Sequence, residues 1–158
     1  MSVCVIDNLT YPFIRLLESL ELQEIDFMDA TRSTIIKLGR VFRLTPLIEL
    51  RLIDNKIRPG EMDILLNHLV DNRTIKKFHL TKVRSLDALT DFITKNTTVE
   101  NFMLSVERSD DNDKKRIMMA LGENKSLINI EMGFMLPDDR INIQSIIDRN
   151  IQNRSEKP

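Results

Sequence analysis

Side chains able to carry out chemistry are few in this chain of 158 residues. The two histidines are His68 and His79, and the single cysteine is Cys4. Neither histidine has a cysteine or a second histidine at the spacing of a zinc site, so no metal site is expected. We expect both histidines on solvated faces, with His79 pointing outward from a strand, where it is able to touch a partner.

The patterns that accompany catalysis are absent from the sequence as well. The four glycines stand alone, which excludes a glycine-rich phosphate loop, and no serine or cysteine lies in a nucleophile-elbow context. The acidic pairs Asp110/Asp111 and Asp138/Asp139 precede expected helices, where capping explains them. We therefore expect a protein that is not an enzyme and uses no cofactor. A hydrolase is kept as a third hypothesis behind two kinds of interaction module.

Composition limits the partners and the compartment. The net charge is −1 with 30% charged residues, which gives no general electrostatic reason to expect nucleic acid or an acidic membrane surface. No uncharged apolar segment approaches the roughly 18 residues of a membrane span. Cys4 cannot form an intrachain disulfide, and the opening segment MSVCVIDNLTYPFIRLL does not read as a signal peptide. We expect a cytoplasmic protein that recognises a protein partner.

A pattern of apolar residues at relative positions 1, 4 and 6 recurs along the chain. Successive copies start about 24 to 28 residues apart, which is within the range of leucine-rich repeats, in which each unit carries one short strand and one helix. The five copies are LQEIDF from Leu22, LIELRL from Leu47, IKKFHL from Ile75, VENFML from Val99 and LINIEM from Leu127.

The pattern has a physical reading. Positions 4 and 6 alternate toward one face of a strand, and position 1 fills the turn that leads into it. Stacked units therefore build a parallel sheet with helices on one face. We predict an α/β leucine-rich-repeat solenoid with a curved parallel sheet of about five short strands, helices on the convex side and helical caps at both ends. It forms one domain over residues 1–158, with an opening helix at about 9–20, repeats at about 21–136 and a closing helix at about 138–152.

The intervals between the strands read as amphipathic helices. Leu86, Leu89 and Ile93 form one stripe behind Ser85, which is placed to cap a helix. Pro59 marks the start of an earlier helix. The closing helix is expected to cover the last strand with four isoleucines, Ile143, Ile146, Ile147 and Ile151.

Asparagine recurs where each helix must end. Asn72, Asn96 and Asn124 each stand three residues before position 1 of a strand. Asparagine tolerates the left-handed backbone conformation, so a left-handed turn is predicted at these positions. At relative position 9, where leucine-rich repeats often carry an asparagine ladder, only Asn55 is present, so a ladder is not expected there. The equivalent places hold Ala30, Val83, Glu107 and Met135.

From about Leu47 onward the sequence resembles the leucine-rich-repeat domain of tropomodulins and leiomodins, which regulate actin. The phrases that carry the resemblance are TPLIELRLIDNKI, KNTTVENFMLSVE and ENKSLINIEMGF, with a long helix after MLPDDR. The resemblance implies a module that binds actin and acts at filament pointed ends. Tropomyosin binding is not carried over, because the first predicted repeat already starts at Leu22, where that family has a long N-terminal arm before its repeats.

The loops that run from strand to helix form one edge of the predicted solenoid. Loops on a rigid scaffold often carry recognition, and these are the longest connections in the chain. The apolar run at residues 134–136 fits packing under the last helix as well as exposure. The resemblance implies actin contacts through this edge and the closing helix, at Asn55, Lys56, Arg58, Glu107, Arg108, Met135 and Arg140.

The concave face of the sheet supports an alternative, an adaptor that binds a protein other than actin. Relative positions 3 and 5 point to this face, giving the pairs Glu24/Asp26, Glu49/Arg51, Lys77/His79, Asn101/Met103 and Asn129/Glu131. Asp26 and Arg51 are placed to pair across neighbouring strands. The face is mixed in charge, so a solvated surface without a partner is an equally simple interpretation. The candidate binding residues here are Arg51, Lys77, His79, Met103 and Glu131.

Overall fold

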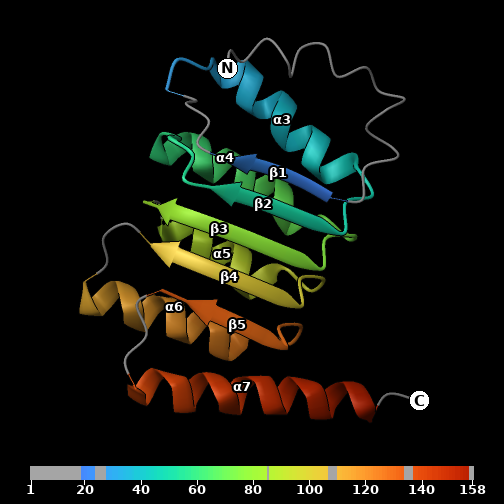
Figure 1. Ribbon diagram of the computed structural model, residues 1–158, viewed down its shortest axis with the longest axis vertical. Coiled ribbons are helices and arrows are strands. Elements are labelled where there is room, and N and C mark those ends of the chain that lie inside the picture. The colour runs from blue at the N-terminus through green and yellow to red at the C-terminus, as the bar shows by residue number, and fades with distance from the viewer. Residues whose placement is uncertain (1–18, 24–27, 85, 107–109, 134–136, 157–158) are drawn as a thin grey trace.

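The chain alternates strands and helices and folds into a two-layer stack (Figure 1). In the computed structural model the described residues are 19–23, 28–84, 86–106, 110–133 and 137–156. Five strands form one parallel sheet in the order β1-β2-β3-β4-β5. The elements are β1 (Ser19–Gln23), α3 (Arg32–Leu44), β2 (Glu49–Ile53), α4 (Pro59–Val70), β3 (Lys77–Val83), α5 (Leu86–Lys95), β4 (Asn101–Val106), α6 (Asp111–Glu123), β5 (Asn129–Met132) and α7 (Pro137–Ser155).

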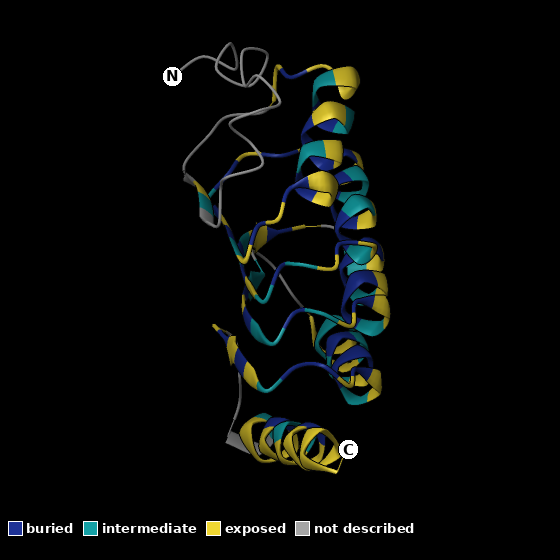
Figure 2. Ribbon diagram, turned by 90° about the vertical axis from the view of Figure 1, so that its right-hand side faces the viewer, coloured by how far each residue is buried: buried dark blue, intermediate teal, exposed yellow. Residues whose placement is uncertain are grey.

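Helices α3 to α6 cover one face of the sheet, and no helix of the described residues covers the other, which is called the open face below (Figure 2). Helix α7 lies across the end of the stack, between the sheet layer and the helix layer. The predicted leucine-rich-repeat architecture and its closing helix are confirmed. Residues 9–18 of the predicted opening helix lie outside the described residues.

The core is built from relative positions 4 and 6. Across β2 to β5 these positions are paired in register and buried. Phe78 and Phe102 stack with ring centroids 5.7 Å apart, and Phe92 of α5 meets the edge of Phe78 at 5.3 Å. The two core rows are Leu50, Phe78, Phe102 and Ile130, and Leu52, Leu80, Leu104 and Met132.

The first repeat differs from the prediction. Strand β1 pairs Leu20 with Leu50, so this unit uses LESLEL, residues 17–22, and not LQEIDF. Both hexapeptides satisfy the 1-4-6 pattern. The length of the connection to the next helix differs between the two. If the last core residue of the strand were Phe27, the N-cap of α3, Thr31, would follow only four positions later. In the next unit, the N-cap of α4, Arg58, follows Leu52 by six positions. The predicted opening helix also ends too late, since Ser19 and Leu20 belong to β1.

The asparagines before each strand do not adopt the left-handed conformation that the sequence suggested. Asn124 has φ −67° and ψ 139°, and among the described non-glycine residues positive φ occurs only at Asp54 and Lys82. Each Oδ1 instead accepts the two backbone N–H groups that lead into the next strand. For Asn96 these are Thr98 and Val99, at 3.0 and 2.9 Å.

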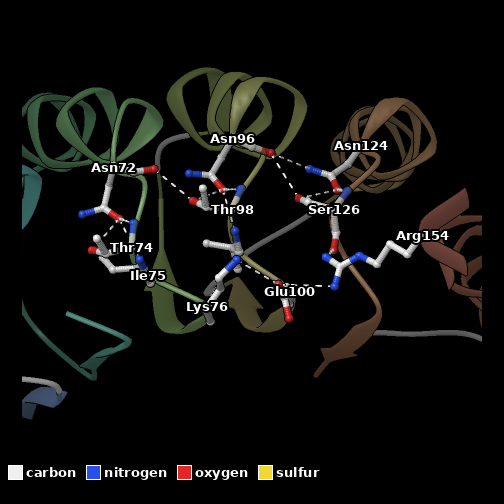
Figure 3. A network of polar contacts seen from close by, with 11 residues as sticks. Asn72, Thr74, Ile75, Lys76, Asn96, Thr98, Glu100, Asn124, Ser126 and Arg154 are labelled. Carbon is white, nitrogen blue, oxygen red and sulfur yellow. Dashed lines mark hydrogen bonds and ion pairs between the residues drawn. The ribbon is translucent and has the colours of Figure 1, made fainter. Parts of the chain in front are cut away.

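The same asparagines connect successive repeats. Each Nδ2 donates to a backbone carbonyl near the end of the helix of the preceding repeat, at Phe42 of α3, Leu69 of α4 and Ile93 of α5 respectively. The hydroxyl two residues later donates to a carbonyl of the previous turn, as Thr98 does to Asn72 at 2.9 Å (Figure 3). An asparagine ladder therefore does connect the repeats, at a position before the strand rather than after it. Its members are Asn72, Asn96 and Asn124.

Polar contacts hold the closing helix in place. Ile143 is buried and Ile146 and Ile147 pack against the core, but Ile151 is exposed, contrary to the prediction. One turn after Ile146, the buried Asn150 donates to the carbonyls of Asn124 and Leu127, at 3.2 and 2.7 Å. The last turns of α7 are therefore fixed by hydrogen bonds to the turn before β5.

His68 is half-buried and does not lie on a solvated face. It sits where α4 crosses α3, directly over Gly39, whose missing side chain makes room for the imidazole. Burial lowers the pKa of His68, and the nearby guanidinium groups of Arg43 and Arg40 lower it further. The imidazole therefore acts as a neutral packing group near pH 7.

Candidate protein-interaction surfaces

The open face of the sheet gathers all five candidate residues of the concave surface. Position 5 forms a row in strand register across β1 to β5, so that each side chain lies beside its counterpart on the next strand. A hollow of about 330 Å³ lies over these strands. The row is Glu21, Arg51, His79, Met103 and Glu131, and Lys77 stands beside it in the position 3 row.

Charges are satisfied at one end of this face. Arg51 Nε donates to Glu49 at 2.6 Å, and its guanidinium lies 3.5 Å from Glu21. The hydrogen bond to Glu49 raises the pKa of Arg51. Glu21 thus takes the role that the sequence analysis gave to Asp26, which lies outside the described residues. Because Arg51 is already paired twice, a partner gains little from it.

Polar side chains at the centre of the open face have fewer partners within the protein. Lys77 forms no ion pair with any described residue. The pKa of His79 is lowered, chiefly by burial and next by Arg51, so the ring is neutral near pH 7 and is able to donate or accept a hydrogen bond. Met103 beside it is 39% exposed. This part of the face offers one cation, one neutral imidazole and one apolar side chain.

The loop edge is held rigid by its backbone. Asp54 and Lys82, at relative position 8 of their units, have φ values of 54° and 56°. The Asp54 N–H donates to Thr81 Oγ1 at 2.6 Å, and that hydroxyl donates back to Asp54 Oδ1 at 3.0 Å. Lys82 lies 3.5 Å from the same carboxylate. The turn after β2 is therefore tied to the end of β3.

The candidate residues on this edge differ in accessibility. Lys56 and Arg140 are exposed, whereas Asn55 is only 5% exposed, so little of its side chain is accessible to a partner. Arg58 is exposed but donates to Glu61 Oε1 at 3.1 Å and to the Met28 carbonyl, which gives it a structural role as well. Glu107, Arg108 and Met135, with the apolar run at residues 134–136, lie outside the described residues.

The sequence analysis missed a groove between α6 and α7. Met118 and Met119 line one side and Ile146 lines the other. A signal for it was present, because Met119 falls off the inward stripe of Ile117, Ala120 and Leu121, so helical geometry directs it outward.

Two classes of site are absent from the described part of the chain. It contains no cluster of three or more His, Cys, Asp or Glu side chains arranged to hold a metal ion. Among its helices, none is both long and apolar enough to cross a bilayer.

The fold defines a class of protein, the leucine-rich-repeat domain closed by a long C-terminal helix. No protein-family model matches this sequence, and no curated protein sequence does. Among solved structures, the tropomodulin C-terminal domain of Caenorhabditis elegans matches with a TM-score of 0.73 and 14% identity. The match covers 98% of this chain and 96% of that one.

A second solved structure, described as actin-binding site 2 of leiomodin-1, matches with a TM-score of 0.70 and 14% identity. It covers 90% of this chain and 85% of that one. The resemblance to the tropomodulin and leiomodin domains is thus confirmed at the level of the fold. It extends over nearly the whole chain and not only the part from Leu47 onward.

Proposed function

We propose that this chain is a non-enzymatic interaction module that binds actin and acts at filament pointed ends. The observation that carries the proposal is the fold match over almost the full length of the tropomodulin domain. The second match supports it, because that domain is described as an actin-binding site. The cytoplasm, in association with the cytoskeleton, is the proposed location.

Actin binding is assigned to the loop edge and the start of the closing helix. Lys56 follows β2 and Arg140 lies in the first turn of α7, so both occupy the edge where the parallel strands end. Both side chains are exposed. The hydrogen bonds between Asp54 and Thr81 hold the turn after β2 against the end of β3, which lowers the entropy lost on binding.

The test uses co-sedimentation with filaments and a pointed-end elongation assay. The double variant Lys56→Glu/Arg140→Glu should weaken binding and restore elongation. Lys125→Glu is the control, because Lys125 is also exposed but lies in a turn at the opposite edge, before β5. Unchanged elongation at micromolar protein, together with absence from the filament pellet, would remove the proposal.

A second function, an adaptor for a protein other than actin, is supported by the unsatisfied centre of the open face. Lys77 has no ion-pair partner among the described residues, and Asn101 and Asn129 lie beside it on the next two strands without side-chain hydrogen bonds to other described residues. Lys77→Glu should abolish adaptor binding and leave filament co-sedimentation intact. Loss of both activities together would assign actin binding to the open face.

A further inference from the structure

Among the described residues, the hydrogen bonds between α6 and α7 lie at the C-terminal end of α6. Arg149 of α7 donates to the carbonyls of Gly122 and Asn124 at the end of α6, at 2.7 and 2.6 Å. Between the N-terminal halves of the two helices lies an open groove with a volume of about 730 Å³. Helix α6 packs against α5, and α7 is held by the hydrogen bonds of Arg149 and Asn150, so both walls of the groove belong to the folded stack.

The lining of this groove is apolar at its centre. Met119 is 69% exposed, and Met118 and Ile146 are half-buried beside it. Single exposed apolar side chains are common, but three that line one concavity from two helices form a patch that gains free energy when covered. Methionine side chains also adapt to different partners, since they are unbranched and polarizable.

The stack itself indicates what shape would cover the patch. Helices α4 and α5 each pack between two neighbouring helices, one from the unit before and one from the unit after. Helix α6 has α5 on one flank. On the other flank, α7 runs from the sheet side at its N-terminal end toward the helix layer at its C-terminal end, and the groove lies between the two helices (Figure 2). The groove therefore occupies the place where the helix of a further repeat would lie. A helix fits it better than an extended segment does.

The charges on the rim of the groove favour some partner helices over others. The rim carries Asp139 on α7 and Asp111, Lys114 and Lys115 on α6. Lys114 is paired with Asp111 at 3.3 Å, whereas the exposed Lys115 forms no ion pair with the described residues. A partner helix gains from an acidic side chain placed against Lys115. We propose that this groove binds an amphipathic helix of a protein partner, with an apolar stripe on Met118, Met119 and Ile146 and an acidic residue beside Lys115. This proposal does not depend on actin binding.

The test is a display library of helical peptides about five turns long, selected on the intact chain and counter-selected on the Met119→Glu variant. Enriched peptides should repeat apolar residues at intervals of three and four and carry an acidic residue on the flank of that stripe. Calorimetry on the best peptide should show a loss of affinity of about tenfold or more for Met119→Glu. Lys115→Glu should weaken the same peptide and favour a version with lysine in place of the acidic residue.

Leu44→Glu provides the matched control, because Leu44 is also an exposed apolar residue but lies at the end of α3, far from the groove in the stack. It should leave peptide affinity unchanged. Enriched peptides without the helical spacing, or equal affinity for Met119→Glu, would overturn the proposal. So would sedimentation analysis showing that Met119→Glu dissolves a dimer, because the occupant would then be a second copy of this chain.

Discussion

The side-chain amide of Asn124 donates to the backbone carbonyl of Asn96 at 3.0 Å, which joins the helix-to-strand turns of two successive repeats. Both residues are almost completely buried. Because the backbone groups that lead into a strand have no partner within the strand or the helix, they need one from elsewhere. The asparagine side chain supplies both a donor and an acceptor at this point.

Replacing one member of the ladder should be costly. Asn96→Ala leaves the N–H groups of Thr98 and Val99 without their acceptor, in or near the core. It also removes one of two donors to the Leu69 carbonyl, which keeps the Asn72 N–H at 3.1 Å. The expected loss of stability is about 2–4 kcal/mol, measured by urea unfolding. Asn96→Asp should also destabilise the protein, since the carboxylate keeps the acceptor but faces the Leu69 carbonyl without a donor.

Asn67→Ala serves as the control for this substitution. Asn67 is exposed on α4, so its replacement should change stability by less than about 0.5 kcal/mol. Equal losses at positions 67 and 96 would contradict a specific role for the ladder.

The two faces of β4 should respond differently to truncation. Leu104 is 1% exposed and packs in the core, whereas its neighbour Met103 is 39% exposed on the open face. Leu104→Ala should cost roughly 2–5 kcal/mol through loss of burial and the cavity left behind. Met103→Ala should cost far less. Equal losses in thermal or urea unfolding would contradict the assignment of these two side chains to opposite faces.

The strands were predictable because burial on one face requires the 1-4-6 spacing, which identified four of the five units correctly. The first unit was not, since LESLEL and LQEIDF both satisfy that spacing and only the pairing of Leu20 with Leu50 distinguishes them. The positions of Asn72, Asn96 and Asn124 were visible as a repeat, but their role was not. Contacts between residues a full repeat apart, such as Asn96 and Leu69, cannot be read from local conformational preference.

The candidate sites were only partly predictable for a related reason. Strand alternation placed His79 and Met103 on the open face correctly. Accessibility of Asn55 depends on how the loop after β2 folds back onto the core, which has no periodic signal. The groove beside Met119 depends on where α7 docks, and Arg149 and Asn150 determine that through contacts with backbone carbonyls.

Gly39→Ala should destabilise the protein, although a glycine in the interior of a helix is normally less stable than alanine by about 0.5–1 kcal/mol. A Cβ at position 39 would lie 2.2 Å from Cδ2 of His68, so the imidazole would have to leave its place against α3 or the packing of the two helices would have to shift. The double variant Gly39→Ala/His68→Ala should recover part of the loss. Gly122→Ala is the control, since a Cβ there meets nothing within 4 Å and should stabilise the protein.

Stability should fall as the solution is acidified from about pH 7 to about pH 5.5. The pKa of His68 is lowered in the folded protein by burial and by Arg43 and Arg40, against a smaller opposing effect of Asp71. The unfolded chain therefore binds more protons than the folded one in this range, so protonation favours unfolding. The pKa of His79 is lowered as well, so protonation of His79 also lowers stability over this range.

Urea unfolding at a series of pH values measures this dependence, and replacing His68 identifies its source. His68→Gln removes one of the two groups and should reduce the slope between about pH 7 and 5.5, whatever it does to stability at higher pH. The pKa of Glu100 is lowered chiefly by its hydrogen bond to Lys76. The stability that this ionised carboxylate contributes is fully present above the ordinary carboxyl pKa and is lost only at pH values below the histidine range. If His68→Gln left the dependence of stability on pH unchanged between about pH 7 and 5.5, the pKa of His68 would be the same in the folded and the unfolded protein. That result would contradict the lowered pKa.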